Sequence, residues 1–173
     1  GETGSGKHFF ARAVHLSSPR KNQPIQSLPA KEFSQNLKGW LGCCEQKNNV
    51  VGEIEKLKGG TLVLSNVEYL SDEAQSVLID LIFEQGYRRQ GSDKLYPIDL
   101  RIICTTRTEL ESFVKQGQFR EDLFKRLNVM PIVTPSLRQH SEDIPELVDY
   151  FVEYFSQHDE LEPRRFNESV FNL

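Results

Sequence analysis

Apolar residues recur along the chain in two alternating patterns, which predict helices and buried strands in turn. Helical spacing of the apolar positions predicts helices over residues 7–17, 72–84, 120–127 and 141–156. Short apolar runs predict buried strands over residues 24–28, 61–64, 98–105 and 131–134. Thr108 and Glu111 have the spacing of a capping box, which predicts a further short helix through Lys115. Residues 30–58 are polar with scattered glycines, and they favour no single kind of element.

Strands that alternate with helices are typical of an α/β fold with a parallel sheet. The 173 residues are enough for one domain with its own core and are marginal for two. The longest apolar run falls well short of the ~20 residues that a membrane span needs, so no membrane association is expected.

Charge and cysteine usage exclude several classes of function. The net charge of −4 argues against a surface that binds nucleic acid as a whole, and no DNA-reading motif is present. Cys43, Cys44 and Cys104 have no paired spacing, which fits a reducing cytoplasm better than a disulfide framework. Two of these cysteines are adjacent and the histidines are scattered, so no metal site is expected.

The first residues, GETGSGK, match the Gly-x4-Gly-Lys core of a phosphate-binding Walker A loop. Glycines let successive backbone N–H groups converge on phosphate oxygens, and the lysine adds a positive charge beside them. The helix that follows presents its N-terminus to the same anion. The alternative is a glycine-rich linker before a helix. The candidate nucleotide-binding residues are Gly1, Glu2, Thr3, Gly4, Ser5, Gly6, Lys7 and His8.

Several longer strings occur in a fixed order: GETGSGKHFFARAVHLSSPR, GGTLVL, FREDLFKRLNV and PSLRQHSEDIPEL. Together they closely resemble the AAA+ domain of the NtrC-type activators of sigma-54 RNA polymerase. The resemblance implies a P-loop three-layer sandwich, with a parallel sheet flanked by helices. It implies a core over residues 1–165, which starts inside the Walker A loop, and the start of a helical lid over residues 166–173. The chain is then a fragment that lacks most of the lid.

The family also implies rings with ATP at the subunit interfaces and a DNA-binding domain outside this chain. In FREDLFKRL, Arg120 and Arg126 match the arginines that reach into a neighbour's nucleotide site. The alternative is that both are solvated arginines on a helix whose apolar residues face the core.

The chain departs from the family at the positions that serve hydrolysis. Ser65 and Asn66 stand where the family has the Walker B Asp-Glu pair, which holds Mg²⁺ and polarises the attacking water. Neither can act as a base near neutral pH, and loss of a general base costs about 10²–10⁴ in rate. His8 replaces the usual Ser or Thr ligand of Mg²⁺, and Arg107 replaces a sensor asparagine. The asparagine that couples nucleotide state to the base aligns with Pro29.

The loop that touches sigma-54 in the family is also missing. Residues 42–51 are shorter than that loop and do not contain its Gly-Ala-Phe-Thr-Gly-Ala motif. Atypical family members without the loop and without the Walker B acids, described as VpsR-like, resemble the chain in both respects. We therefore expect RNA polymerase as a partner, without sigma-54.

A charge count favours a retained anion site. An intact pocket with one lysine, two carboxylates and Mg²⁺ carries about +1, and Lys7 alone again leaves about +1. ATP, ADP and cyclic di-GMP are the candidate ligands, and Mg²⁺ is not expected.

The leading hypothesis is a cytoplasmic, non-enzymatic regulatory domain of a transcription regulator that binds a nucleotide and self-associates as a dimer or a ring. One alternative is a slow ATPase that recruits another carboxylate, with Glu68, Asp72 and Glu73 as candidates. A second alternative is a purely structural dimerisation domain.

Overall fold

The computed structural model describes residues 1–45, 48–158 and 166. They form two compact units: Gly1 with residues 6–133, and residues 2–5 with residues 134 onward. The first unit contains every strand of the described part of the chain, and the second contains one long helix. The expected start of a lid over residues 166–173 lies outside the described residues, apart from Phe166.

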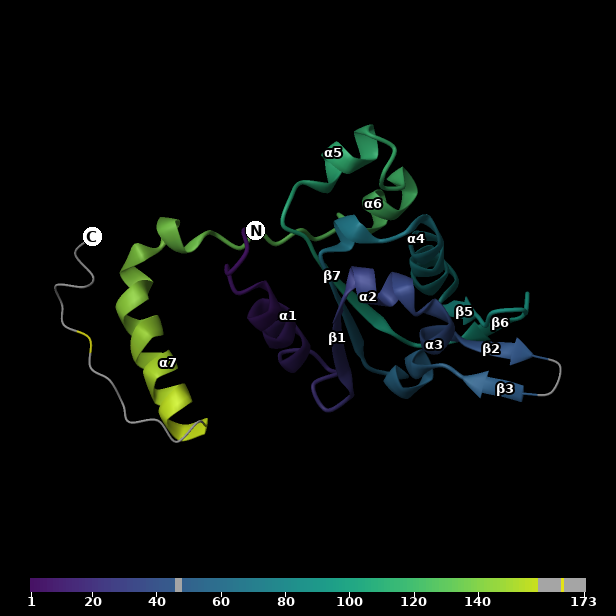
Figure 1. Ribbon diagram of the computed structural model, residues 1–173, viewed down its shortest axis with the longest axis horizontal. Helices are drawn as coiled ribbons and strands as arrows, with labels where there is room; N and C mark the ends of the chain where they lie inside the picture. The colour runs from purple at the N-terminus through teal and green to yellow at the C-terminus, as the bar shows by residue number, and fades with distance from the viewer. Residues whose placement is uncertain (46–47, 159–165, 167–173) are drawn as a thin grey trace. The chain divides into compact units, whose positions relative to one another are not determined.

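The centre of the first unit is a three-stranded parallel sheet (Figure 1). Its strands lie in the order β1 (Ile25–Pro29), β4 (Thr61–Ser65), β7 (Arg101–Thr105). All five residues of β4 are buried, as expected for a strand with a neighbour on either side and helices above and below. The prediction of a parallel α/β sheet is confirmed.

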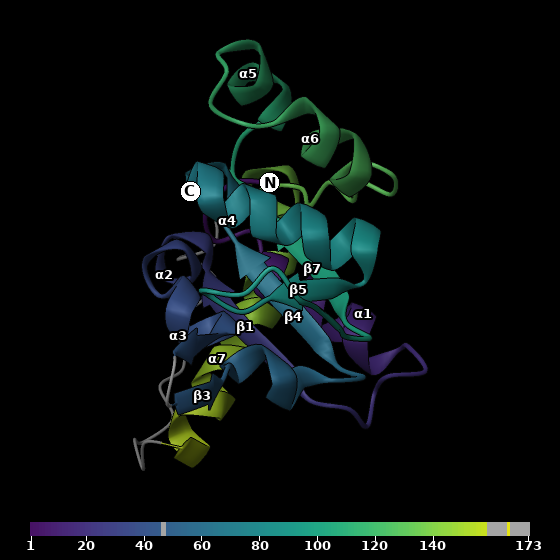
Figure 2. The same cartoon turned by 90° about the vertical axis from the view of Figure 1, so that its right-hand side faces the viewer.

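Helices cover both faces of this sheet (Figures 1 and 2). Helix α1 (Lys7–Leu16) lies on one face, where the buried His15 Nδ1 is 2.9 Å from the hydroxyl of Thr61. The opposite face is covered by α2 (Ala30–Gln35), α3 (Leu37–Leu41) and α4 (Asp72–Ile79). Most of the apolar core lies between these helices and β4. The three-layer arrangement expected for a P-loop AAA+ domain is therefore present.

Shorter elements complete the first unit. Two hairpins are formed by β2 (Gly42–Glu45) with β3 (Asn48–Val51) and by β5 (Gly86–Arg88) with β6 (Leu95–Pro97). The helical pieces are η1 (Glu53–Leu57), η2 (Val67–Tyr69), η3 (Asp80–Glu84), α5 (Leu110–Lys115) and α6 (Glu121–Leu127). The second unit contains η4 (Leu137–Gln139), η5 (Ser141–Asp143) and α7 (Ile144–His158).

The structure resolves the region that the sequence pattern left open. Residues 30–58 form α2, α3, the first hairpin and η1. In this hairpin Gly42 pairs with Val51, so the segment that replaces the sigma-54 loop is a short antiparallel ribbon. Two backbone hydrogen bonds join it to the second hairpin, from Cys44 N to Gln90 O (2.9 Å) and from Gln90 N to Gly42 O (3.1 Å).

Most predicted elements are confirmed, with shifted ends. The strand expected over 24–28 is β1, and the one expected over 98–105 is reduced to β7, because Ile98 and Asp99 bond to Gln85 and Gly59 outside the sheet. The four predicted helices correspond to α1, to α4 with η3, to α6, and to η5 with α7.

Two local predictions are wrong. Residues 131–134 take no regular structure. The segment opens on Pro131, which has no backbone N–H to give to a sheet, and Pro135 follows it directly. The capping box at Thr108 is also absent. The helix begins at Leu110, and Thr108 N instead donates to the hydroxyl of Thr106 in a tight turn.

Candidate functional site

The candidate site lies where the three parallel strands of the first unit end. Pro29, Ser65 and Thr105 are the last residues of β1, β4 and β7, and they are paired in register. In open α/β sheets, ligands bind beyond the carboxyl ends of the strands. The sequence positions singled out for Walker B and for the sensor therefore meet at the edge of the sheet where a ligand would bind.

The phosphate-binding loop has the backbone that its glycines permit. Gly4 and Gly6 have φ values of 85° and 73°, in the left-handed region that glycine adopts without steric cost. Gly6 is the N-cap of α1, and a Cβ at either glycine would meet nothing within 4 Å. The open space above these backbone positions fits a loop built to let an anion approach.

Lys7 is held beside the end of the sheet by its own loop. Its Nζ donates to the carbonyl of Gly1 at 2.6 Å, and the terminal amine of Gly1 donates to Thr106 O at 3.3 Å. The pKa of Lys7 is below its usual value, first because of burial and then because of the positive charge of Arg107. The negative charge of Glu68 acts in the opposite direction. Lys7, Glu68 and Arg107 therefore share one electrostatic environment.

The residues in the Walker B positions both have structural roles. The hydroxyl of Ser65 donates to the carbonyl of Leu28 on β1 at 3.4 Å, and Ser65 is buried. Asn66 has a left-handed backbone (φ 56°), which asparagine tolerates better than most residues. Its side-chain oxygen accepts a hydrogen bond from Nε of Arg107 at 3.1 Å.

Arg107 and Glu68 complete this cluster. The backbone N–H of Arg107 donates to Oε1 of Glu68 at 3.2 Å, and its guanidinium carbon lies 6.0 Å from the ring centre of Tyr69. Glu68 is only 6% exposed. Asp72 and Glu73, the other carboxylates considered as replacements, are exposed in the first turn of α4.

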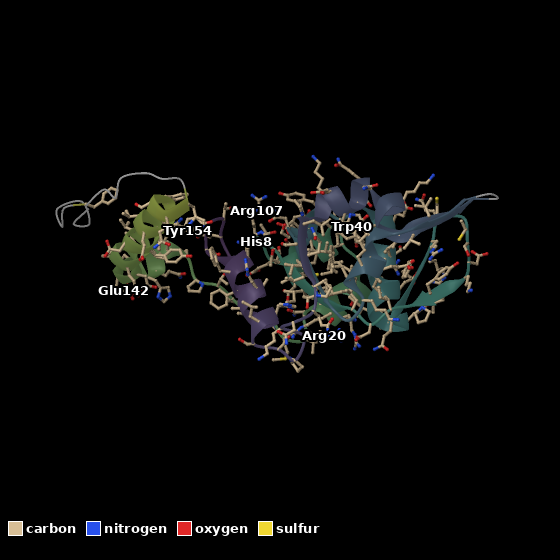
Figure 3. The ribbon with its side chains drawn as sticks, turned by 90° about the horizontal axis from the view of Figure 1, so that it is seen from below. His8, Arg20, Trp40, Arg107, Glu142 and Tyr154 are labelled. Atoms are coloured by element: carbon tan, nitrogen blue, oxygen red, sulfur yellow. The ribbon has the colours of Figure 1, made fainter. Side chains whose placement is uncertain are left out.

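His8 and Arg107, both labelled in Figure 3, have different hydrogen-bond partners. Nδ1 of His8 lies 3.3 Å from the hydroxyl of Ser27 on β1, and its side chain is exposed. His8 is thus held toward the strand beside β4.

The two candidate bridging arginines lie on or next to α6 and contact their own chain. Arg120 forms an ion pair with Asp122 (2.8 Å) and donates to the hydroxyl of Ser76 (3.1 Å). The guanidinium of Arg126 lies 5.4 Å from the ring centre of the exposed Phe83. Sequence reasoning missed the buried Gln75, which accepts from the backbone N–H of Arg120 at 2.8 Å. A lone glutamine on an apolar helix face was the available signal.

The second unit holds a hollow of about 200 Å³ beside the phosphate-binding loop. Its lining is Glu2, Thr3, Gly4, Ser5, Ser136, Leu137 and Arg138. Arg138 pairs with Glu2 at 2.8 Å, and the hydroxyls of Ser5 and Thr134 are 2.9 Å apart. The sequence pattern gave no sign of this contact, because the partners are more than a hundred residues apart.

Two classes of site are not found in the described residues. No group of three or more histidine, cysteine, aspartate or glutamate side chains could hold a metal ion there. No helix in the same part of the chain is long and apolar enough to cross a membrane.

The fold and the loop define a P-loop AAA+ domain. The family described as the sigma-54 interaction domain matches residues 1–133, and the chain belongs to this family. Members are usually ATPases that oligomerise and work with RNA polymerase.

Relatives in the same family are regulators of transcription. The chain is 36% identical to the Nif-specific regulatory protein of Sinorhizobium fredii over 91% of its length, and 39% identical to the transcriptional regulatory protein XylR of Pseudomonas putida over 88%. It spans only 28% of each of these proteins. The structure of NtrX from Brucella abortus with ADP superposes with a TM-score of 0.87 at 33% identity, over 98% of this chain and 38% of NtrX.

Proposed function

We propose that this chain is the central AAA+ domain of a bacterial DNA-binding transcription regulator, and that it binds a nucleotide or another phosphate ligand without hydrolysing it. The observation that carries the proposal is the use of the Walker B positions. The hydroxyl of Ser65 donates a hydrogen bond to the carbonyl of Leu28, and the amide oxygen of Asn66 accepts one from Arg107. Neither side chain offers a carboxylate for Mg²⁺ or for a water molecule.

Retained phosphate binding is supported by the loop and the charges near it. The loop keeps its left-handed glycines, and Lys7 and Arg107 place two positive charges near the ends of the strands. ADP and ATP are the first candidate ligands, because the related NtrX has been solved with each of them. Cyclic di-GMP is a third candidate, and the missing carboxylates argue against bound Mg²⁺. The ligand-binding residues in this proposal are Gly1 to His8.

The proposed partners follow from what the family does and from what this chain has lost. The family's way of working fits self-association through Arg120 and Arg126. It also fits DNA binding through a domain outside this chain and action on RNA polymerase in the cytoplasm. The short ribbon over residues 42–51 argues against contact with sigma-54. Residues 42–51 also lack the Gly-Ala-Phe-Thr-Gly-Ala motif that touches sigma-54 in the family.

One rival function has a specific observation in its favour. Glu68 is a buried carboxylate within electrostatic reach of Lys7, so it could serve a slow ATPase as a replacement base. Because Glu68 is only 6% exposed, a water molecule has little access to its carboxylate, and this argues for binding without turnover.

Calorimetry and a phosphate-release assay on the same purified protein test the proposal. We expect ADP or ATP to bind in the presence of EDTA, and Lys7→Ala to abolish binding while leaving the thermal unfolding temperature nearly unchanged. Phosphate release should stay at the level of the Lys7→Ala control. Phosphate release above that control would establish the slow ATPase instead. If neither ATP, ADP nor cyclic di-GMP binds, the purely structural dimerisation domain is the remaining function.

A further inference from the structure

Glu68 has an unusual environment for a carboxylate. It lies in η2, directly after the strand that carries the Walker B positions, and it is 6% exposed. Oε1 accepts one hydrogen bond from the backbone of Arg107, whereas Oε2 is buried and has no hydrogen-bond partner among the described residues. A buried carboxylate oxygen without a donor is costly, and positive charge nearby offsets part of this cost.

The stabilising charges are the two cations of the candidate site. Lys7 interacts electrostatically with Glu68 and is repelled by Arg107. Arg107 does not form an ion pair with Glu68 through its side chain. Its Nε donates to Asn66, and only its backbone N–H reaches the carboxylate. Glu68 thus offsets part of the positive charge around Lys7.

We propose that Glu68 is an internal counter-charge that selects phosphate ligands by their charge, disfavouring a nucleoside triphosphate relative to a diphosphate when no metal is bound. This inference rests on the proposed binding of nucleotides and names the specificity of that site. Phosphates held by Lys7 bring negative charge toward a buried carboxylate. In a site with Walker B acids a divalent cation lies between carboxylates and phosphates, but here no acid remains at Ser65 or Asn66 to anchor one.

The repulsion grows with each phosphate group and is strong enough to measure. Two like charges several ångströms apart at the edge of a protein interior, with an effective dielectric constant of about 20, interact by an amount on the order of a tenfold change in affinity. Burial of Glu68 also keeps this interaction from being screened as a surface pair would be.

The experiment is calorimetry of ATP and ADP binding in EDTA, with the complete natural protein and with Glu68→Gln. Glutamine keeps an oxygen for the backbone N–H of Arg107 and removes only the charge. We expect Glu68→Gln to raise the affinity for ATP on the order of tenfold and the affinity for ADP by less, so that the ratio of the two dissociation constants shifts toward ATP. The matched control is Glu73→Gln, an exposed carboxylate in the first turn of α4, which should leave both affinities unchanged.

Thermal unfolding of each variant checks the fold, and Glu68→Met is the second neutral variant. Apolar residues of similar size are often tolerated in place of buried charges. If wild type binds both nucleotides and the neutral variants leave the ratio unchanged, the selective role of Glu68 is wrong while nucleotide binding stands. If only the neutral variants bind the nucleotides, the counter-charge role of Glu68 is supported, and the proposal that the natural protein binds a nucleotide is wrong. If no form of the protein binds either nucleotide, both proposals fall.

Discussion

The side-chain oxygen of Gln75 accepts a hydrogen bond from the backbone N–H of Arg120 at 2.8 Å, which fixes the start of α6 against α4. The amide nitrogen of Gln75 donates to the carbonyls of Leu70 and Gln118, at 3.2 and 3.1 Å. Gln75 is fully buried. A single side chain therefore joins the segment before α4 to the segment that leads into α6, and it sets the place from which the Arg120 side chain extends.

Replacing Gln75 should destabilise the domain. Gln75→Leu keeps the volume and leaves three backbone groups without their partner, so we expect a loss of about 3 kcal/mol in the free energy of unfolding. Urea denaturation monitored by circular dichroism measures it. The control Glu73→Gln, on the exposed side of the same helix, should change stability by less than about 0.5 kcal/mol. A Gln75→Leu protein as stable as wild type would show that these hydrogen bonds do not hold α6 in place.

The bridging role of Arg120 and Arg126 predicts a change in assembly without a change in fold. Arg120→Ala removes an exposed ion pair with Asp122, which contributes only about 0–1 kcal/mol to stability. We expect Arg120→Ala and Arg126→Ala to shift the sedimentation coefficient of ligand-bound protein toward the monomer. Lys125→Ala lies on the same helix, pairs with Glu121 and should leave assembly unchanged. A wild type that stays monomeric with every ligand, or variants that assemble as wild type does, would contradict the bridging role.

Restoring the Walker B acids tests why turnover is lost. Ser65→Asp with Asn66→Glu supplies a Mg²⁺ ligand and a base, and we expect phosphate release to rise by at least tenfold over wild type. The gain is limited because glutamate would sit in a left-handed conformation, at a cost of about 1 kcal/mol. The new aspartate also could not donate to Leu28 O as Ser65 does.

Adding Lys7→Ala to the restored variant should abolish the gain, which assigns the activity to this site. Equal phosphate release with and without Lys7 would instead indicate a contaminating ATPase.

The lowered pKa of Lys7 predicts how ligand affinity depends on pH. Burial and Arg107 disfavour the charged form, so the free protein loses the Lys7 proton below the usual value of 10.5. A bound phosphate favours the charged form and raises this pKa again. ADP affinity should therefore be constant near neutral pH and fall as the pH rises through the alkaline range below 10.5.

Lys7→Arg is the matched control for this titration. Arginine keeps its charge throughout the range, so its ADP affinity should not fall there. Calorimetry at a series of pH values measures both proteins. An identical fall in the two would assign the titration to another group.

The class of fold and the chemistry available to it can be predicted from the order of amino acids alone. The alternation of apolar runs with helical spacing predicted a parallel α/β sheet, because buried strands and one-sided helices need different periods of apolar residues. The strings GETGSGK and GGTLVLSN placed the phosphate-binding loop and the missing acids along the chain. The local pattern failed at residues 131–134, an apolar run that opens on Pro131 and takes no regular structure.

Which residues act together at the strand ends depends on the three-dimensional fold. Glu68 was one of three candidate carboxylates in the sequence, and burial beside Lys7 distinguishes it from the exposed Asp72 and Glu73. Arg107 follows β7 and Asn66 follows β4, so their hydrogen bond exists only because these strands pair in register. Charge interactions and hydrogen bonds depend on distances in space, and residues forty positions apart along a chain carry no local pattern that encodes such distances.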